Sequence, residues 1–398
     1  MGKAFTVNRT KAQRELKLME HRFKIPFNKP FVAGKELYYI SQAVMEGHLS
    51  GNGPFSRQCQ NWLESRLGCK KALLTHSCTG ALEMAAILCD VKDGDEIIMP
   101  SFTFVSTANA FVLRGAKVVF VDIKQDTLNL DERLIEEAIT PKTKVIVPVH
   151  YAGISCGMDR ILEIAQKNRL WVIEDAAQGF LSTYKKNYLG TLGNMGCLSF
   201  HETKNIISGE GGALLINDDS LAERAEIVWE KGTNRRQFFE GQTDKYTWVD
   251  LGSSFLPSEL VGAFLYAQFE QAEKIIAARA RKFFRYCELL LPLEENGCFR
   301  LPHVGNDSYG NGHIFYIITR SFEERKRLIA YLKERGISAI FHYIPLHSSP
   351  AGIRYGQVSG SMDITNRISE RILRLPLYYE MTDEDQDLVV KSLRSFYK

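Results

Sequence analysis

The stretch Trp171-Val-Ile-Glu-Asp-Ala-Ala-Gln178 joins a short apolar run to a group of polar side chains. Segments with the apolar spacing of helices separate it from four earlier apolar runs, at residues 72–75, 96–99, 117–121 and 145–149. Strands that alternate with helices in this way are typical of βαβ units, in which helices cover both faces of a mostly parallel sheet. The sequence therefore predicts an α/β fold with a large doubly wound sheet, whose ligands lie at the carboxyl ends of the strands.

The pattern changes after residue 212, where helical spacing becomes dominant. Residues 258–290 predict one long, nearly unbroken helix, which Pro292 is expected to end. Beyond it we expect a smaller α+β unit, with elements at residues 314–319, 323–335, 339–342, 365–373 and 383–396. The expected organisation is a basic N-terminal extension (1–24), a large domain (25–257), and a bridging helix with a small C-terminal domain (258–398).

The composition is that of an ordinary globular protein, and it argues against several classes of function. The 398 residues carry 50 basic and 47 acidic side chains, a formal net charge of +3. So small a charge argues against binding to nucleic acid or to a membrane surface. The excess lies in residues 1–24, which hold seven basic and two acidic side chains. The longest uncharged run, 97–113, is interrupted by Pro100 and several hydroxyls, and is a core segment rather than a membrane span.

Eight cysteines are spread along the chain. None forms a C-x-x-C pair and no histidine is spaced to complete a zinc site, so we expect no metal centre. Dispersed thiols in a long chain are typical of small buried side chains in a reducing compartment, and no apolar signal-peptide segment follows the N-terminus. We therefore expect a cytoplasmic, enzyme-sized protein.

Asp175 and Lys204 are the leading candidates for chemistry. Asp175 ends an apolar strand, with Gln178 close behind, although a strand-end aspartate is as often the cap of the next turn. Lys204 lies between an apolar strand that ends near Ser199 and the glycine-rich turn 208–212. A single lysine is usually a solvated surface cation. A lysine withdrawn from water, however, has a lowered pKa and can form a Schiff base with an aldehyde.

The strand-to-helix junction at residues 75–83 contains Ser77, Thr79 and Gly80. Free N–H groups at the start of a helix, together with two hydroxyls, make a site for a phosphate. Simple N-capping by one hydroxyl is the alternative, but it leaves the second hydroxyl and the glycine unexplained. The chain has no Walker A sequence and no G-x-G-x-x-G between a strand and a helix, which disfavours nucleotide or NAD binding by those motifs.

These candidates, with Phe104 as an aromatic neighbour, together suit pyridoxal 5′-phosphate (PLP). The phosphate of this cofactor needs a cup of donors, and its aldehyde needs an amine. Its pyridine nitrogen needs a carboxylate to stay protonated, so that the ring can act as an electron sink. Each element alone is a weak signal, and their joint occurrence is what favours PLP.

From Ile25 onward the chain resembles the sugar-nucleotide aminotransferases of the DegT/DnrJ/EryC1/StrS family. The resemblance rests on Met99-Pro-Ser-Phe-Thr-Phe-Val-Ser-Thr-Ala-Asn109, Pro148-Val-His-Tyr-Ala-Gly153, Glu174-Asp-Ala-Ala-Gln178, Ser199-Phe-His-Glu-Thr-Lys204 and His342-Tyr-Ile-Pro-Leu-His347. It implies the fold-type I architecture of PLP-dependent aminotransferases. It also implies that Lys204 holds the aldehyde and that Asp175 partners the pyridine nitrogen. The other implied cofactor contacts are Gln178 near the ring hydroxyl, Phe104 on the ring, and Thr79, Gly80 and Ser199 at the phosphate.

The resemblance further implies an active site shared between two subunits, and hence an isologous homodimer. In many relatives an asparagine of the neighbouring subunit completes the phosphate site, within a Gly-aromatic-Asn-aromatic motif. Here the motif reads Gly252-Ser-Ser-Phe255, so the hydroxyl of Ser254 takes that place. His342 and His347 match the segment that faces the sugar substrate.

Three stretches, His201-Glu-Thr-Lys-Asn205, Lys231-Gly-Thr-Asn-Arg235 and Gly252-Ser-Ser254, are similar to those of dTDP-4-amino-4,6-dideoxygalactose transaminases of enterobacterial common antigen synthesis. The implied reaction moves the amino group of glutamate to C4 of dTDP-4-keto-6-deoxy-D-glucose. Amination at C3, or a gluco-configured product, remains possible with the same core motifs. Family dehydratases have histidine in place of the lysine, so Lys204 argues against them. A non-catalytic PLP-fold regulatory protein would be expected to lose Lys204 or Asp175.

Overall fold

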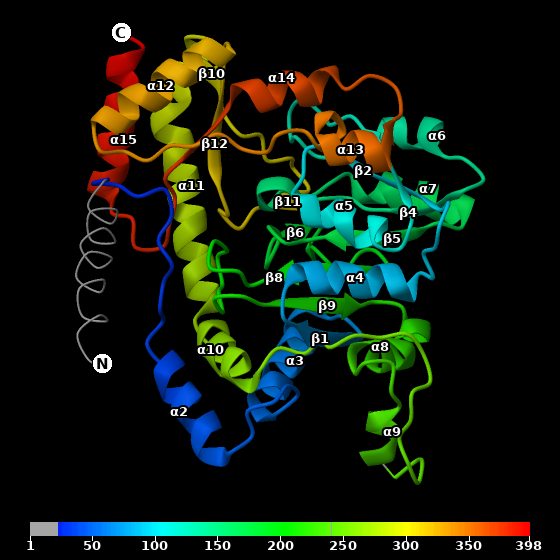
Figure 1. Ribbon diagram of the computed structural model, residues 1–398. Helices are drawn as coiled ribbons and strands as arrows, with labels where there is room; N and C mark the ends of the chain where they lie inside the picture. Colours follow the sequence, from blue (N-terminus) through cyan, green and yellow to red (C-terminus); the bar gives the residue numbers. More distant parts are fainter. Residues whose placement is uncertain (1–22, 240) are drawn as a thin grey trace, which may run out of the picture.

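The main sheet determines where a site can lie. A computed structural model describes residues 23–239 and 241–398, and its main sheet has eight strands in the order β1-β9-β8-β5-β4-β2-β3-β13 (Figure 1). β9 runs antiparallel to both of its neighbours, and the other strands all run in one direction. The strands are β1 (Lys71–Thr75), β2 (Glu96–Pro100), β3 (Lys117–Val121), β4 (Thr143–Ile146), β5 (Trp171–Asp175), β8 (Met195–Ser199), β9 (Gly212–Ile216) and β13 (Gly356–Val358). The predicted mostly parallel, doubly wound sheet is confirmed.

Helices cover both faces of this sheet. Successive side chains of a strand point to opposite faces, and in β3 Val118 and Phe120 enter one apolar core while Val119 and Val121 enter the other. The first core is closed by α4 (Cys78–Leu88), α5 (Val105–Val112) and α8 (Ala222–Trp229). The second core is closed by α3 (Pro54–Leu67), α7 (Met158–Asn168) and α10 (Glu259–Phe269).

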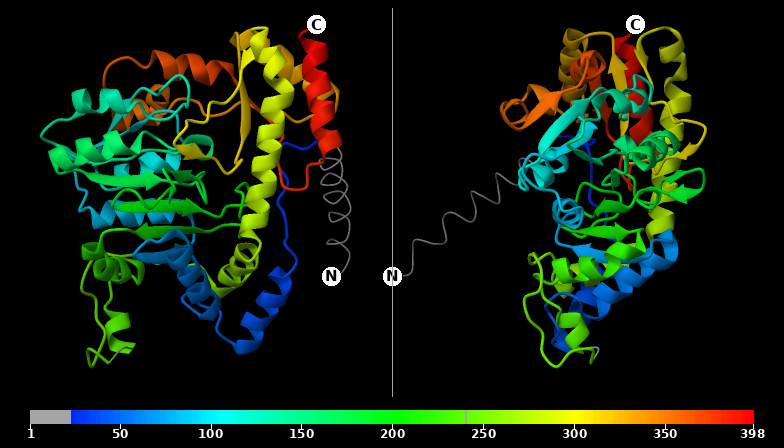
Figure 2. Two further views of the ribbon diagram at one scale, coloured as in Figure 1. Left: turned by 180° about the vertical axis from the view of Figure 1, so that it is seen from behind. Right: turned by 90° about the vertical axis from the view of Figure 1, so that its right-hand side faces the viewer.

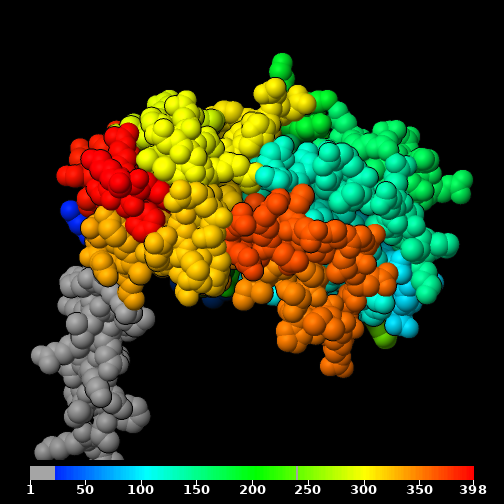
Figure 3. Space-filling view, turned by 90° about the horizontal axis from the view of Figure 1, so that it is seen from above, coloured from blue at the N-terminus to red at the C-terminus, as the bar shows by residue number. Residues whose placement is uncertain are grey.

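A smaller antiparallel sheet lies beside the carboxyl ends of the main strands. Its order is β10-β12-β14, with bounds Phe299–Arg300, Phe315–Thr319 and Ile372–Leu375. One face packs on α11 (Ala272–Glu295), α12 (Phe322–Glu334) and α15 (Asp383–Phe396), which lie together in Figures 1 and 2. The other face carries Tyr316, which packs with Phe102 and Tyr151 from loops of the main sheet. Figure 3 shows the C-terminal segments (orange) against those loops (turquoise).

The remaining elements are short or peripheral. The helices are α2 (Glu36–Glu46), α6 (Ile135–Ala138), α9 (Arg235–Phe239), α13 (Pro350–Tyr355) and α14 (Asp363–Arg371). Short 3₁₀ turns occur at Glu132–Leu134, Tyr151–Gly153, Asp219–Leu221 and Leu346–Ser348. A third sheet has the order β11-β6-β7, with bounds Ser308–Tyr309, Thr183–Tyr184 and Asn187–Tyr188.

Four expectations for the C-terminal part were wrong in detail. The helix expected at 258–290 is two helices, because α10 packs on the core of the main sheet and α11 then turns towards the small sheet. Pro292 lies in the last turn of α11, where the one hydrogen bond that it removes does not end the helix. Residues 339–342 form only a single bridge, Ile340 with Arg374. Residues 372–373, expected to end the helix 365–373, belong to β14.

The expected N-terminal extension, 1–24, lies almost wholly outside the described residues. Ile25 bridges Ile337 and packs in the core of the small sheet, and the proposed division at 257/258 stays a prediction. No helix in the described part of the chain is long and apolar enough to cross a membrane. All eight cysteines are free thiols.

Candidate active site

The carboxyl ends of β1, β2, β5 and β8 lie at one edge of the main sheet, and the predicted site residues follow them. Asp175 is the last residue of β5 and Ser199 the last of β8. Thr79 and Gly80 lie in the first turn of α4, just after β1, and Phe104 follows β2. The strand-end position inferred for Asp175 therefore agrees with the structure.

The carboxylate of Asp175 is held by two donors. The hydroxyl of Thr107, in α5, donates to Oδ2 at 2.7 Å, and the backbone N–H of Ala177 donates to Oδ1 at 3.1 Å. Thr107 is fully buried, and its hydroxyl also forms a 2.9 Å hydrogen bond with that of Thr103. This chain of hydroxyls fixes the plane of the carboxylate and directs it into the cluster at the sheet edge.

Lys204 lies in a turn that the backbone holds tightly. The N–H of Phe200 donates to the carbonyl of Gly211 at 2.8 Å, and the N–H of Lys204 donates to that of His201 at 2.8 Å. Within the described residues the ammonium group of Lys204 has no hydrogen-bond partner. Burial lowers the pKa of Lys204, and the charge of Arg374 acts in the same direction, while Cys78 and Asp175 oppose it. Lys204 therefore carries an amine that loses its proton more readily than an ordinary lysine.

The start of α4 offers donors to an anion. The hydroxyl of Ser77 caps the helix by accepting from the N–H of Gly80 at 3.1 Å. The N–H groups of Cys78 and Thr79 have no intrahelical acceptor, as at any helix start. Thr79 Oγ1 donates to Ser106 Oγ at 2.8 Å, so a second hydroxyl lies at the same place. The N–H of Gly80 is thus already bonded to Ser77, and the N–H groups left for an anion are those of Cys78 and Thr79.

A glycine of β9 lets this helix start approach the sheet. A Cβ at Gly212 would lie 2.4 Å from the backbone nitrogen of Cys78, which no side chain tolerates. Gly212 is paired with Ser199 across β8 and β9, and with Thr75 across β1 and β9. Ser199 is therefore the strand neighbour of the glycine that contacts the start of α4. The sequence predicts a phosphate site at this place.

Gln178 and Phe104 both lie near Tyr343, but Gln178 is held by hydrogen bonds and Phe104 is exposed. Gln178 Oε1 accepts from the N–H of Ala152 at 2.8 Å, and its Nε2 donates to the hydroxyl of Tyr343 at 2.9 Å. Both ends of this amide are fixed, so its orientation is set before any ligand binds. Phe104 is 57% exposed, and its ring centroid lies 6.5 Å from that of Tyr343. An aromatic face is thus open to a ligand there.

The two predicted substrate histidines lie at different depths. His342 is buried, and its Nδ1 forms a 2.6 Å hydrogen bond with the hydroxyl of Tyr151. Burial, with the charges of Arg374 and Lys204, holds the pKa of His342 well below its usual range, so its imidazole is neutral at neutral pH. His347 Nδ1 lies 2.8 Å from the hydroxyl of Ser101, and burial lowers its pKa as well.

Ser254 precedes Phe255, whose carbonyl accepts from the N–H of His76 at 2.9 Å beside the start of α4. Its side chain is exposed, and its backbone forms an isolated bridge with Glu230. The contact of Ser254 with a phosphate stays a prediction.

Comparison with known proteins identifies the family. Residues 32–394 match the DegT/DnrJ/EryC1/StrS aminotransferase family. The chain belongs to this family. Among its relatives, the spore coat polysaccharide biosynthesis protein SpsC of Bacillus subtilis (strain 168) is 31% identical over 391 residues, which cover 94% of this chain and 97% of SpsC.

Solved structures agree with this assignment. Aminotransferase TlmJ from Streptoalloteichus hindustanus has a TM-score of 0.85 at 27% identity, covering 94% of this chain and 98% of TlmJ. Spr1654 from Streptococcus pneumoniae, described as a sugar aminotransferase, was solved in its PMP form. It has a TM-score of 0.87 at 25% identity, and the match covers 94% of this chain and 99% of Spr1654. The protein is therefore a PLP-dependent sugar aminotransferase of fold type I, which uses a keto-sugar and an amino donor.

The residues of this family member fit PLP. The unpartnered amine of Lys204 suits its aldehyde, and the free N–H groups at the start of α4 suit its phosphate. Asp175, anchored by Thr107, suits its pyridine nitrogen. Individual contacts to the cofactor stay predictions, including those of Gln178, Phe104 and Ser199.

Thr107 was not among the candidates from the sequence, and its hydrogen bond to Asp175 predicts a measurable role. We expect Thr107→Val, which keeps the size but removes the hydroxyl, to lower kcat about tenfold, since a hydrogen bond to a charged group contributes about 1.5–3 kcal/mol. Steady-state rates together with the absorbance of bound PLP would measure this. Thr107→Ser is the matched control and should retain most activity; equal losses in both variants would contradict the role of the hydroxyl.

The lowered pKa of Lys204 predicts a gain in stability when its charge is removed. While protonated, the buried amine costs stability; the cost is complete below its folded pKa and disappears as pH rises towards 10.5, the ordinary lysine value. We therefore expect Lys204→Met to raise the Tm of the cofactor-free enzyme at pH 7, by about 1 °C for each kcal/mol of relieved cost in a chain of 398 residues. The gain should shrink at pH 10. Calorimetry at both pH values tests this, and a gain that did not depend on pH would refute it.

Proposed function

We propose that this aminotransferase moves the amino group of glutamate to C4 of dTDP-4-keto-6-deoxy-D-glucose and forms dTDP-4-amino-4,6-dideoxy-D-galactose. Amino transfer itself is supported by one observation above all, the unpartnered amine of Lys204 in the electrostatic reach of the anchored carboxylate of Asp175. The sugar assignment is supported by three stretches, His201-Glu-Thr-Lys-Asn205, Lys231-Gly-Thr-Asn-Arg235 and Gly252-Ser-Ser254. The similarity to SpsC, a spore coat polysaccharide biosynthesis protein, supports a product that is a precursor of a cell-surface polysaccharide such as enterobacterial common antigen.

Each of the site side chains has a separate role in the proposed reaction. When bound, PLP supplies an aldehyde for the donor's amine and a ring that accepts an electron pair. With the cofactor bound, Lys204 Nζ would take the proton from the donor's Cα and return it where the amino group is received. Asp175 holds the proton of the pyridine nitrogen. His342 and His347, both with lowered pKa values, present neutral imidazoles to the keto-sugar.

We further propose that the active enzyme is a homodimer with its active sites at the interface. Ser254, predicted to contact a phosphate, is exposed in its own chain. The segment just before it exposes four large apolar side chains: Tyr246, Trp248, Val249 and Leu251. An apolar segment of this kind favours a partner surface. Light scattering at micromolar concentration should give twice the chain mass; a fully active monomer would contradict the proposal.

The decisive experiment is to determine the product. The purified enzyme, glutamate and dTDP-4-keto-6-deoxy-D-glucose should give a nucleotide sugar whose NMR couplings place nitrogen at C4 in the galacto configuration. A C3-amino or gluco-configured product would show the alternative substrate assignment within the same family. If the protein took up no PLP at all, the assignment of the site would fail.

A further inference from the structure

Arg374, in β14, is a partly buried cation, and no anion among the described residues lies beside it. Its Nε is buried and has no hydrogen-bond partner, and the ring of Phe27, 4.6 Å from the guanidinium carbon, covers it. Within the described residues no carboxylate pairs with it. Even a partly buried charge is costly when nothing compensates it, so Arg374 favours a partner that the protein itself does not supply.

The register of the small sheet directs this side chain towards the active site. In β14, Leu373 and Leu375 enter the core beneath α11 and α15, so Arg374 projects from the opposite face. Its partner across the sheet is Tyr316, whose side chain lies on the same face. The ring of Tyr316 lies 5.8 Å from that of Tyr151, which in turn is hydrogen-bonded to His342. Arg374 thus faces the substrate side of the Lys204 site.

The other charges around Lys204 already have partners or roles. Arg279 is buried too, but it donates to the carbonyl groups of Gly312, His313 and Leu377. Asp175 accepts from Thr107 and faces the pyridine nitrogen. His313 and His342 are neutral, because burial and the neighbouring cations lower their pKa values. Within this cluster Arg374 is the charge that lacks a partner.

We propose that Arg374 binds a carboxylate of the amino-acid donor and so places the donor's amine beside Lys204. This inference rests on the proposed use of glutamate. A guanidinium matches a carboxylate with two parallel hydrogen bonds. The diphosphate of the sugar nucleotide is the competing anion, but it is attached at C1, across the sugar ring from C4. When C4 is at the reacting centre, the diphosphate therefore lies a full ring away, whereas the α-carboxylate shares a carbon with the reacting amine.

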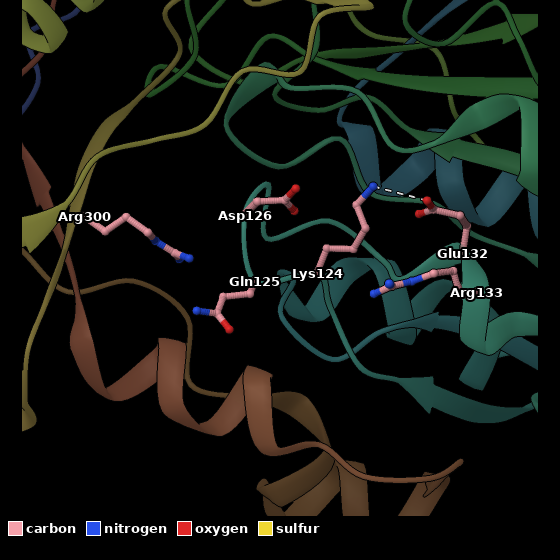
Figure 4. A pocket seen from close by; sticks show the side chains of 6 residues that line it. All are labelled: Lys124, Gln125, Asp126, Glu132, Arg133 and Arg300. Carbon is pink, nitrogen blue, oxygen red and sulfur yellow. Dashed lines mark hydrogen bonds and ion pairs between the residues drawn. The ribbon is translucent and has the colours of Figure 1, made fainter.

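Arg300 provides a matched control on the same small sheet. It lies in β10, and its terminal nitrogen is also buried without a partner. Figure 4 shows that its side chain enters a different cavity, of about 530 Å³, lined also by Lys124, Gln125, Asp126, Glu132 and Arg133. Arg300→Gln thus removes another arginine of the small sheet, one within electrostatic reach of Asp126, without touching the proposed donor site.

The test separates donor binding from the rest of the reaction. Titration calorimetry of the PLP-loaded enzyme with 2-oxoglutarate, which does not react with that form, should show a Kd raised ten- to a hundredfold in Arg374→Gln, partly recovered in Arg374→Lys and unchanged in Arg300→Gln. The KM for glutamate in the donor half-reaction, followed by the PLP absorbance, should rise in parallel. Unaltered binding of dTDP to all variants would show that the fold is intact and that the diphosphate is not the partner.

Each outcome decides between supporting and rejecting the proposal. If Arg374→Gln weakens the binding of glutamate and of glutamine equally, the α-carboxylate is the ligand. If it weakens the binding of glutamate alone, the ligand is the γ-carboxylate. Unchanged 2-oxoglutarate affinity in both Arg374 variants, or weakened dTDP binding alone, overturns the proposal. A wild-type enzyme that does not react with glutamate would instead refute the proposed function. Should Arg374→Gln fail to fold, Arg374→Lys, which keeps the charge but loses the paired geometry, carries the test.

Discussion

Lys204→Ala is expected to reduce amino transfer by about a thousandfold or more, since a positioned general base alone contributes about 10²–10⁴-fold. The reason is specific to this site. Burial and Arg374 lower the pKa of this amine, so it gives up its proton more readily than an ordinary lysine. Single-turnover conversion of glutamate to 2-oxoglutarate measures the loss without interference from product release.

Two controls show that the loss is chemical rather than structural. Lys167→Ala removes an exposed lysine of α7 that pairs with Glu136, and it should leave the rate unchanged. Added methylamine should restore part of the activity of Lys204→Ala, because a free amine can replace the missing proton carrier. A Lys204→Ala enzyme that retained even a tenth of the wild-type rate would show that another group moves the proton.

Asp175→Asn is expected to reduce the rate about a hundredfold or more, by analogy with other losses of electrostatic stabilisation at a reacting centre. The substitution keeps the size of the side chain and can still accept from Thr107, but it removes the negative charge that keeps the pyridine nitrogen protonated. The rate of the donor half-reaction and the pH dependence of the PLP absorbance would measure the effect. The ring should lose its nitrogen proton at lower pH in the variant.

Asp122 is the matched control for this substitution. It directly follows β3 and accepts from the N–H groups of Ile364 and Thr365 at the start of α14, at 3.0 and 2.8 Å. Asp122→Asn should therefore lower the free energy of unfolding and leave the donor half-reaction nearly unchanged. If Asp175→Asn lost only stability in the same way, Asp175 would be a cap and not a catalytic residue.

This pair of aspartates shows what the sequence could not distinguish. Asp122 and Asp175 both stand at the carboxyl ends of parallel strands, where function and capping are equally common. Asp122 turns out to cap a helix that begins 241 residues later along the chain, at Asp363. Asp175 is instead anchored by Thr107 and left facing Lys204. Only contacts between distant residues separate the two roles.

The same limit explains the errors in the C-terminal part. Helical spacing at 258–290 was correct, but the break between α10 and α11 depends on two separate cores that the helices join. Residues 372–373 were expected to end a helix, yet they belong to β14 because β12 offers an edge for pairing. Local spacing predicts an element well only where no distant partner competes for the same residues.

The sequence by itself determined the alternation of apolar runs, and with it the doubly wound sheet and the order of Asp175 and Lys204 along its edge. It also contained the motifs that place the chain among PLP-dependent sugar aminotransferases. Tertiary structure alone decided that Thr107 holds Asp175, that the amine of Lys204 is withdrawn from water, and that Arg374 lacks a partner. The physical reason is that periodicity is a local property of the chain, whereas desolvation and pairing depend on which distant residues the fold brings together.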